Sequence, residues 1–227
     1  MTLNRLKTGR PRPSFYIREY RAHVPGEVRS GLFVFILMSL LYCMGCNPAS
    51  INAGFPEVPL EPVANSASSA KIGIARVEDS RPNRSAGMIG SSPQVNLLVG
   101  PELPDYIERE FRNELATRGI TSVDALNPAK TGKPAEYKTI VITLQSATFA
   151  TSDPVFVSAD SSVNIAVQVY AILSTNVVFG GSYSGTNQER IGFSRGTGMR
   201  SGAILAVAAN RAVDAAFADV KFEQALK

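Results

Sequence analysis

The sequence predicts an α+β domain of order β-α-β-β-β-α, in which a mostly antiparallel sheet carries two helices packed on one face. Three patterns support this: strand-like alternation over 71–77 and in three runs between 137 and 186, a helical repeat over 102–118, and an alanine-rich repeat over 200–224. Strands that come in a run between helices are typical of α+β folds. The short connections between the last three strands favour antiparallel pairing. We therefore expect a single domain over residues 71–227, long enough to enclose one core.

The first strand and the first helix have clear boundary signals. Ile72 and Ile74 alternate with small residues before the turn-forming run Asp79-Ser80-Arg81-Pro82-Asn83. A short extra strand is expected around Val95–Val99. The helix begins after Pro101 and is followed by Gly119, which is a favourable stop residue. Its apolar face comprises Leu103, Ile107, Phe111 and Leu115 at i+4 spacing.

The second half of the domain is predicted to hold three strands and one helix. Residues 121–137 contain Asn127-Pro128 and Gly132-Lys133-Pro134, so we expect a loop there. The strands are expected over 137–150, 162–174 and 177–186, with Asn164 and Gln168 facing outward and a hairpin turn at Thr175-Asn176. The helix over 200–224 buries a face rich in alanine, which allows a close approach to the sheet.

The first 45 residues have the features of a signal peptide. Residues 1–30 are rich in Arg and Lys, and an uncharged apolar run follows at 31–45. This run of about 15 residues is shorter than the ~20 that a spanning helix needs, so it favours an export signal. The alternative is an uncleaved inner-membrane anchor. The basic stretch is long for a signal peptide, and a start at Val28 would leave an ordinary one. We therefore interpret residues 1–27 as a wrongly assigned translation start.

Gly45-Cys46, at the end of the apolar run, resembles a bacterial lipobox. The resemblance implies cleavage before Cys46, a diacylglycerol on its thiol and an acyl chain such as palmitate on its new amino group. Cys43 and Met44 depart from the usual residues before a lipobox cysteine. Asn47, where Asp would retain the protein in the inner membrane, implies anchoring at the periplasmic face of the outer membrane of a Gram-negative host. The inner membrane is the alternative.

The lipidated Cys46 is followed by a segment rich in Pro, Ser and Ala, up to residue 70. Such a composition disfavours a long helix or a central strand. We predict that residues 46–70 form a flexible tether between the lipid and the domain. An ordered edge segment around Phe55–Val63 is the alternative.

The composition excludes several classes of chemistry. The formal net charge is +4, but the excess of basic residues lies in the leader and the chain after it is close to neutral, so no nucleic-acid partner is expected. His23 is the only histidine, and the two cysteines are Cys43 and Cys46. Zinc sites and nucleophilic triads need these side chains, so we expect no enzyme, no cofactor and no metal. A carboxylate pair drawn from Glu78, Asp79, Asp153 and Asp160 is the remaining catalytic hypothesis, and solvated turn carboxylates are the simpler interpretation.

The most distinctive polar group of the sequence surrounds the end of the first strand. Arg76, Asp79, Arg81 and Arg84 are interpreted as a surface patch that binds a protein partner. The alternative is a turn held by a local Asp–Arg pair, which contributes ~0–1 kcal/mol when exposed.

The chain resembles the YajG-type family of bacterial lipoproteins. The matching segments are Gly45-Cys46, the strand ending at Asp79-Ser80-Arg81, the helix closing with Thr117-Arg118-Gly119-Ile120, and the strand Thr139–Thr148. The resemblance implies a periplasmic α+β domain anchored to the outer membrane, and it brings no catalytic residues.

Two functions remain from the sequence. The first is a non-enzymatic envelope lipoprotein whose domain is an interaction or accessory module for an unidentified envelope protein. The second is a periplasmic binder or carrier of an apolar, lipid-like ligand. A filled core favours the first function, and an apolar cavity of a few hundred Å³ favours the second.

Overall fold

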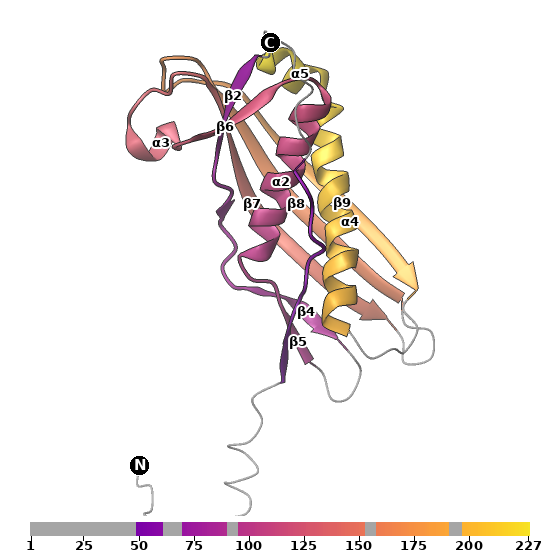
Figure 1. Cartoon of the computed structure of the whole chain (residues 1–227). Helices are drawn as coiled ribbons and strands as arrows, with labels where there is room; N and C mark the ends of the chain where they lie inside the picture. The colour runs from indigo at the N-terminus through magenta and orange to yellow at the C-terminus, as the bar shows by residue number, and fades with distance from the viewer. Residues whose placement is uncertain (1–48, 61–69, 90–94, 153–157, 191–196) are drawn as a thin grey trace, which may run out of the picture. The chain divides into compact units, whose positions relative to one another are not determined.

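The computed structural model describes residues 49–60, 70–89, 95–152, 158–190 and 197–227 (Figure 1). The predicted signal peptide and Cys46 lie outside these residues. No helix within the described ranges is both long enough and apolar enough to cross a membrane.

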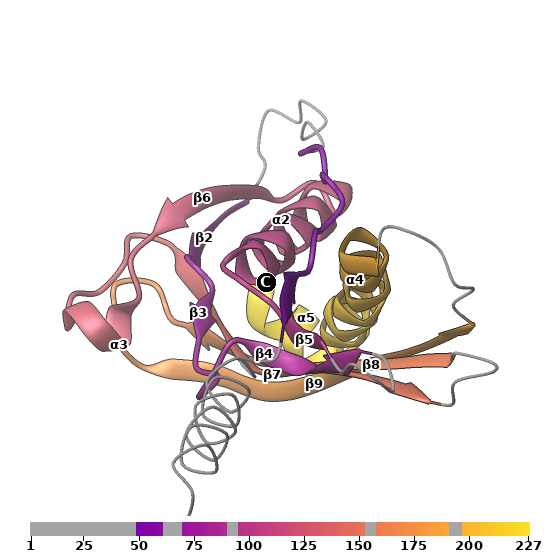
Figure 2. The same ribbon diagram turned by 90° about the horizontal axis from the view of Figure 1, so that it is seen from below.

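A six-stranded mixed sheet forms the body of the domain. Five strands follow the order β6-β2-β7-β8-β9, and the sixth, β3, also pairs with β7. The strands are β2 (Lys71–Ala75), β3 (Glu78–Asp79), β6 (Thr121–Ala125), β7 (Lys138–Ser152), β8 (Ser158–Tyr170) and β9 (Val177–Arg190). The helices α2 (Glu102–Thr117), α4 (Thr197–Phe217) and α5 (Val220–Leu226) lie on one concave face of this sheet (Figure 2). The predicted α+β class and the one-sided helix layer are therefore confirmed.

Within the main sheet, the strands are antiparallel only from β7 to β9. β2 runs parallel to both β6 and β7, and β6 falls within the predicted loop 121–137, so that part of the loop prediction is wrong. Gly119 adopts φ +70° after α2, and the chain then returns beside β2 to complete a β-α-β unit. The rest of the predicted loop contains the short helix α3 (Pro128–Thr131), which is capped by Asn127, and the turns on either side of it.

The predicted last helix is divided into two. α4 ends at Phe217, and Asp219 takes an extended conformation in which its side chain accepts a hydrogen bond from the N–H of Lys221. This N-cap starts α5 in a new direction. Phe222 therefore folds back onto Phe217, with ring centroids 5.2 Å apart, and onto Phe179 of β9, at 5.5 Å.

The space between the sheet and the helices is filled by side chains. Phe111 of α2 contacts Phe217 and Phe222 with ring centroids 5.3 and 6.5 Å apart. The inward-facing residues of β8 (Val163, Ile165, Val167 and Val169) are fully buried beneath α4. The aromatic cluster at one end and the aliphatic layer at the other form one continuous core.

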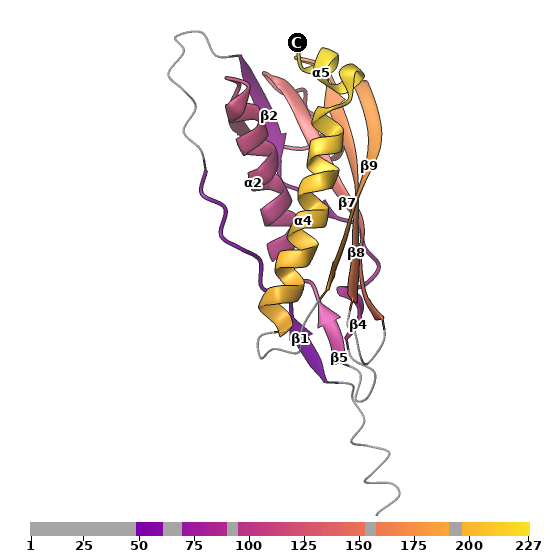
Figure 3. The same ribbon diagram turned by 90° about the vertical axis from the view of Figure 1, so that its right-hand side faces the viewer.

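The structure corrects the tether prediction at its beginning. β1 (Ser50–Asn52) pairs in parallel with β5 (Val95–Leu98), which pairs with β4 (Ser85–Ile89) in a second, three-stranded sheet. The chain then runs along the helices on the side away from the main sheet (Figure 3). Phe55 packs 5.9 Å from the ring of Tyr106, and the carbonyl of Pro59 accepts a hydrogen bond from Asn113. Residues 49–60, here called the strap, are therefore ordered, whereas 61–69 lie outside the described residues.

Candidate functional site

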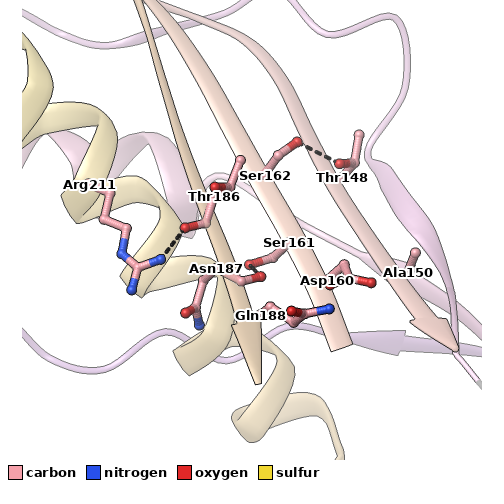
Figure 4. A pocket seen from close by; sticks show the side chains of 9 residues that line it. All are labelled: Thr148, Ala150, Asp160, Ser161, Ser162, Thr186, Asn187, Gln188 and Arg211. Atoms are coloured by element: carbon pink, nitrogen blue, oxygen red, sulfur yellow. Dashed lines mark hydrogen bonds between the residues drawn. The ribbon is translucent and has the colours of Figure 1, made fainter. Parts of the chain in front are cut away.

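A polar depression of about 460 Å³ lies at one end of the main sheet, on the face opposite the helices (Figure 4). Its lining comes from β7, β8, β9 and α4. The lining residues are Thr148, Ala150, Asp160, Ser161, Ser162, Thr186, Asn187, Gln188 and Arg211. The depression is open to solvent, so its polar groups are accessible to another molecule.

Strand alternation places small polar groups on this face. In β8 the odd-numbered residues from Ala159 to Val169 point into the core, so the even-numbered residues point outward. The hydroxyl groups of Thr148 and Ser162 are 2.7 Å apart across β7 and β8, and Asn164 donates to the hydroxyl of Ser146 at 2.6 Å. These bonds between side chains of neighbouring strands hold a surface of hydroxyl and amide groups. The predicted outward orientation of Asn164 and Gln168 agrees with this arrangement.

Helix α4 is held close to the sheet at the depression. Gly185 of β9 has no side chain, and a Cβ there would lie 1.9 Å from the carbonyl oxygen of Ala208. The buried hydroxyl of Ser161 donates to the carbonyl of Ile204 at 3.2 Å. Because the helix lies so near, Arg211 reaches past β9 and donates to the carbonyl of Thr186, as Figure 4 shows.

The depression is suited to binding. Its ionisable side chains are Asp160 and Arg211, and the rest of the lining offers hydroxyl, amide and backbone groups. The described residues contain no group of three or more side chains able to hold a metal ion. Hydrogen-bonding groups of this kind can recognise a polar surface or a peptide.

The structure places the four residues of the predicted patch in different environments. The side chain of Arg81 is only 3% exposed. It donates to both carboxylate oxygens of Asp79, from Nε at 2.8 Å and from Nη2 at 2.6 Å, and Nη2 also donates to the carbonyl of Val99. This hydrogen-bonded guanidinium lowers the pKa of Asp79. Arg81 therefore links the turn to the end of β5, while Arg76 and Arg84 are the exposed arginines of the patch.

Arg76 lines a second depression, of about 320 Å³, between β2, β6 and α2. It lies 3.7 Å from Asp105. Arg112 of α2 lies beneath, 2.9 Å from Glu108 and 2.7 Å from Asp124. Neither Arg112 nor Asp124 was predicted from the sequence as a site residue. Asp124 belongs to β6, which was predicted as a loop. The two arginines of the lining are therefore paired with three carboxylates, Asp105, Glu108 and Asp124, so the depression has no excess positive charge.

The three described carboxylates considered for catalysis, Glu78, Asp79 and Asp160, have separate partners or lie on different strands. Glu78 accepts one hydrogen bond from Asn127 at 2.6 Å and forms an ion pair with Lys130 at 2.9 Å, whereas Asp79 is bound by Arg81. Asp160 lies at the far end of β8, opposite Ala150. Asp153 lies outside the described residues.

The helices α2 and α4 carry neighbouring acidic groups that were not predicted from the sequence as site residues. Burial, together with the negative charge of Glu110, raises the pKa of Tyr106 to about 12. Burial also raises the pKa of Glu110, to which the charges of Glu114 and Asp214 contribute. These residues lie on the helices that the strap follows.

Comparison with known proteins gives only distant structural similarities. Neither a known protein family nor a curated protein sequence matches the chain. A DUF330-family protein from Xanthomonas campestris is 11% identical over 78% of this chain and 92% of its own, with a TM-score of 0.40. A putative neuraminyllactose-binding hemagglutinin homolog from Helicobacter pylori is 10% identical over 77% and 95%, with a TM-score of 0.45. A lipoprotein from Neisseria meningitidis is 11% identical over 56% and 88%, with a TM-score of 0.36.

Proposed function

We propose that this chain is a lipid-anchored protein of the bacterial envelope and that its domain is a non-catalytic interaction module. The observation that carries the proposal is the asymmetry of the main sheet. One face is covered by helices (Figure 2) and filled with buried side chains, whereas the other has no described helix over it. Around the depression this second face presents hydroxyl and amide groups. The filled core favours this function over a carrier of an apolar ligand.

The anchor belongs to the same proposal. With lipid on Cys46, the ordered part of the domain would begin close to the membrane, because β1 starts at Ser50. Four residues of fully extended chain span at most about 14 Å. The acyl groups would place the domain at the periplasmic face of the outer membrane, and Asn47 is the residue that supports this location over the inner membrane. Membership of the YajG-type family remains a prediction from the matching segments.

The anchor is tested by the intact mass of the protein extracted from membranes of the native host. We expect a mass equal to residues 46–227 plus a diacylglycerol and an acyl chain. Cys46→Ala should abolish this species, and Cys43→Ala, as the matched control, should leave it unchanged. A protein that retains residues 31–45 without lipid would instead indicate an uncleaved anchor.

The interaction function is tested by photo-crosslinking in intact cells. A benzophenone side chain is placed at Gln168, on the open sheet face, and in a second strain at Arg109, on the exposed side of α2. We expect Gln168 to yield one reproducible crosslinked envelope protein that Arg109 does not yield. If neither position, nor other positions on the open face, gives a specific product, the interaction module is rejected.

A further inference from the structure

The edge of β9 that faces away from β8 is long. β9 is the terminal strand of the main sheet, and no described strand pairs with its other side. It has 14 residues, whereas strands typically have about five or six. Natural proteins usually protect such edges with lysine, proline or a very short strand. Between Val177 and Gln188, β9 contains no charged residue and no proline.

The hydrogen bond from Arg211 identifies the backbone groups that face outward. Arg211 donates to the carbonyl of Thr186 from the edge, so this carbonyl points away from β8. The β8–β9 register has no irregularity beyond Phe179, and backbone groups alternate between the two sides of a strand. The N–H and C=O groups of Ser182 and Ser184 therefore also face the free edge.

Two arginines of α4 lie along the same edge, and one of them, Arg211, adds positive charge there. No carboxylate among the described residues forms a salt bridge with Arg211. One turn from the beginning of the described helix, Arg200 contacts the carbonyl of Arg190 at 3.4 Å and the carboxylate of Glu189 at 3.5 Å. A second copy of the chain, paired through β9 about a two-fold axis, would bring the same arginine-bearing side of α4 against itself. Repulsion between like charges therefore disfavours a symmetric dimer.

We propose that the β9 edge binds an extended, acidic segment of a partner protein by strand addition. The segment pairs with the backbone of Ser182 and Ser184, and a carboxylate of the segment is bound by the guanidinium of Arg211. Strand addition supplies main-chain hydrogen bonds, and a charge-assisted contact selects the sequence. The polar depression adjoins this edge through Thr186 and Gln188 and receives neighbouring side chains of the segment. This inference rests on the proposed interaction function and names the kind of partner.

The test is selection from a library of random peptides of about nine residues against the full-length protein in detergent, since a peptide of that length matches the open part of the edge. The selected peptides should be enriched in Asp and Glu. Arg211→Gln should weaken their binding by about tenfold, as expected for the loss of one charge-assisted contact. Arg109→Gln, the same change on the exposed side of α2, should leave binding unchanged.

A second measurement locates the contact. In the wild-type protein, bound peptide should slow the hydrogen exchange of the Ser182 and Ser184 amides. Ser184→Pro should abolish binding yet remain folded, because proline is tolerated where a strand N–H faces solvent. The proposal is overturned if no peptide is selected, if the selected peptides lack acidic residues, or if binding protects other amides. Any of these results leaves the anchor and the crosslinking on the open face unaffected, so the proposed function would survive.

Discussion

Tyr183 of β9 donates a hydrogen bond of 2.8 Å from its hydroxyl to Oδ2 of Asp219, the residue that caps α5. Oδ1 of the same carboxylate accepts the N–H of Lys221 at 2.8 Å. One side chain therefore joins the edge strand to the point where the C-terminal helix breaks. The hydrogen bond from Tyr183 lowers the pKa of Asp219, and burial raises the pKa of Tyr183.

Replacing Tyr183 by Phe should weaken this connection. The substitution removes one hydrogen bond and keeps the ring, so we expect the free energy of unfolding to fall by about 1 kcal/mol. Chemical denaturation at neutral pH measures the change. Tyr137→Phe is the control, and an equal loss of stability in both variants would contradict a specific role for the contact with Asp219.

The contribution of Tyr183 should disappear in acid. The pKa of Asp219 is lower in the folded protein than its ordinary value of 3.8. A lowered pKa means that the stabilisation is present above the unfolded pKa and is lost as the pH falls through the folded pKa. The difference in Tm between wild type and Tyr183→Phe should therefore narrow as the pH is lowered from about 5 to about 2. A constant difference over this range would contradict the assignment.

The close approach of α4 to the sheet should not tolerate a methyl group at Gly185. Because a Cβ would lie 1.9 Å from the carbonyl of Ala208, Gly185→Ala must move the helix or the strand. We expect a loss of about 2 kcal/mol in the free energy of unfolding, which is typical of overpacking. Gly180→Ala is the matched control on the same strand, since nothing lies within 4 Å of a Cβ there. Equal stability of the two variants would mean that the helix adapts freely.

The buried guanidinium of Arg81 should stabilise the turn after β3. Arg81→Gln removes its hydrogen bonds to Asp79 and Val99, and we expect a loss of about 2 kcal/mol, as for hydrogen bonds to a charged group. Arg84→Gln changes an exposed arginine nearby and should alter stability by less than about 0.5 kcal/mol. Urea denaturation of both variants checks the difference. A larger effect of Arg84→Gln would contradict the structural role of Arg81.

The charge of Glu110 should destabilise the folded protein at neutral pH. Its pKa is raised above the ordinary value of 4.5 by burial and by Glu114 and Asp214. A raised pKa means that stability is fully present below the unfolded pKa and is lost as the pH rises through the folded pKa. Glu110→Gln should therefore raise Tm at pH 7 and have a smaller effect near pH 4. Thermal unfolding at both pH values tests this, and a variant that is less stable at pH 7 would refute it.

The sequence by itself determined the elements whose signals are local. Spacing between near neighbours predicts the apolar face of α2 and its stop at Gly119. It also predicts the alternation of β8, with Asn164 and Gln168 facing outward. Such spacing fixes which side of a helix or strand is buried, whatever packs against it. The same local patterns led to the one-sided helix layer.

Only the tertiary structure decided which segments complete the sheets and which charged groups are buried. Thr121–Ala125 has no strong apolar pattern and becomes β6 because β2 offers its backbone a partner. The strap is ordered because Phe55 reaches Tyr106. Arg81 is buried by contact with Val99, and Arg211 reaches the edge at Thr186 because Gly185 admits α4 so closely. Each depends on residues distant in the sequence, and the free energy of such contacts exists only when the chain brings them together.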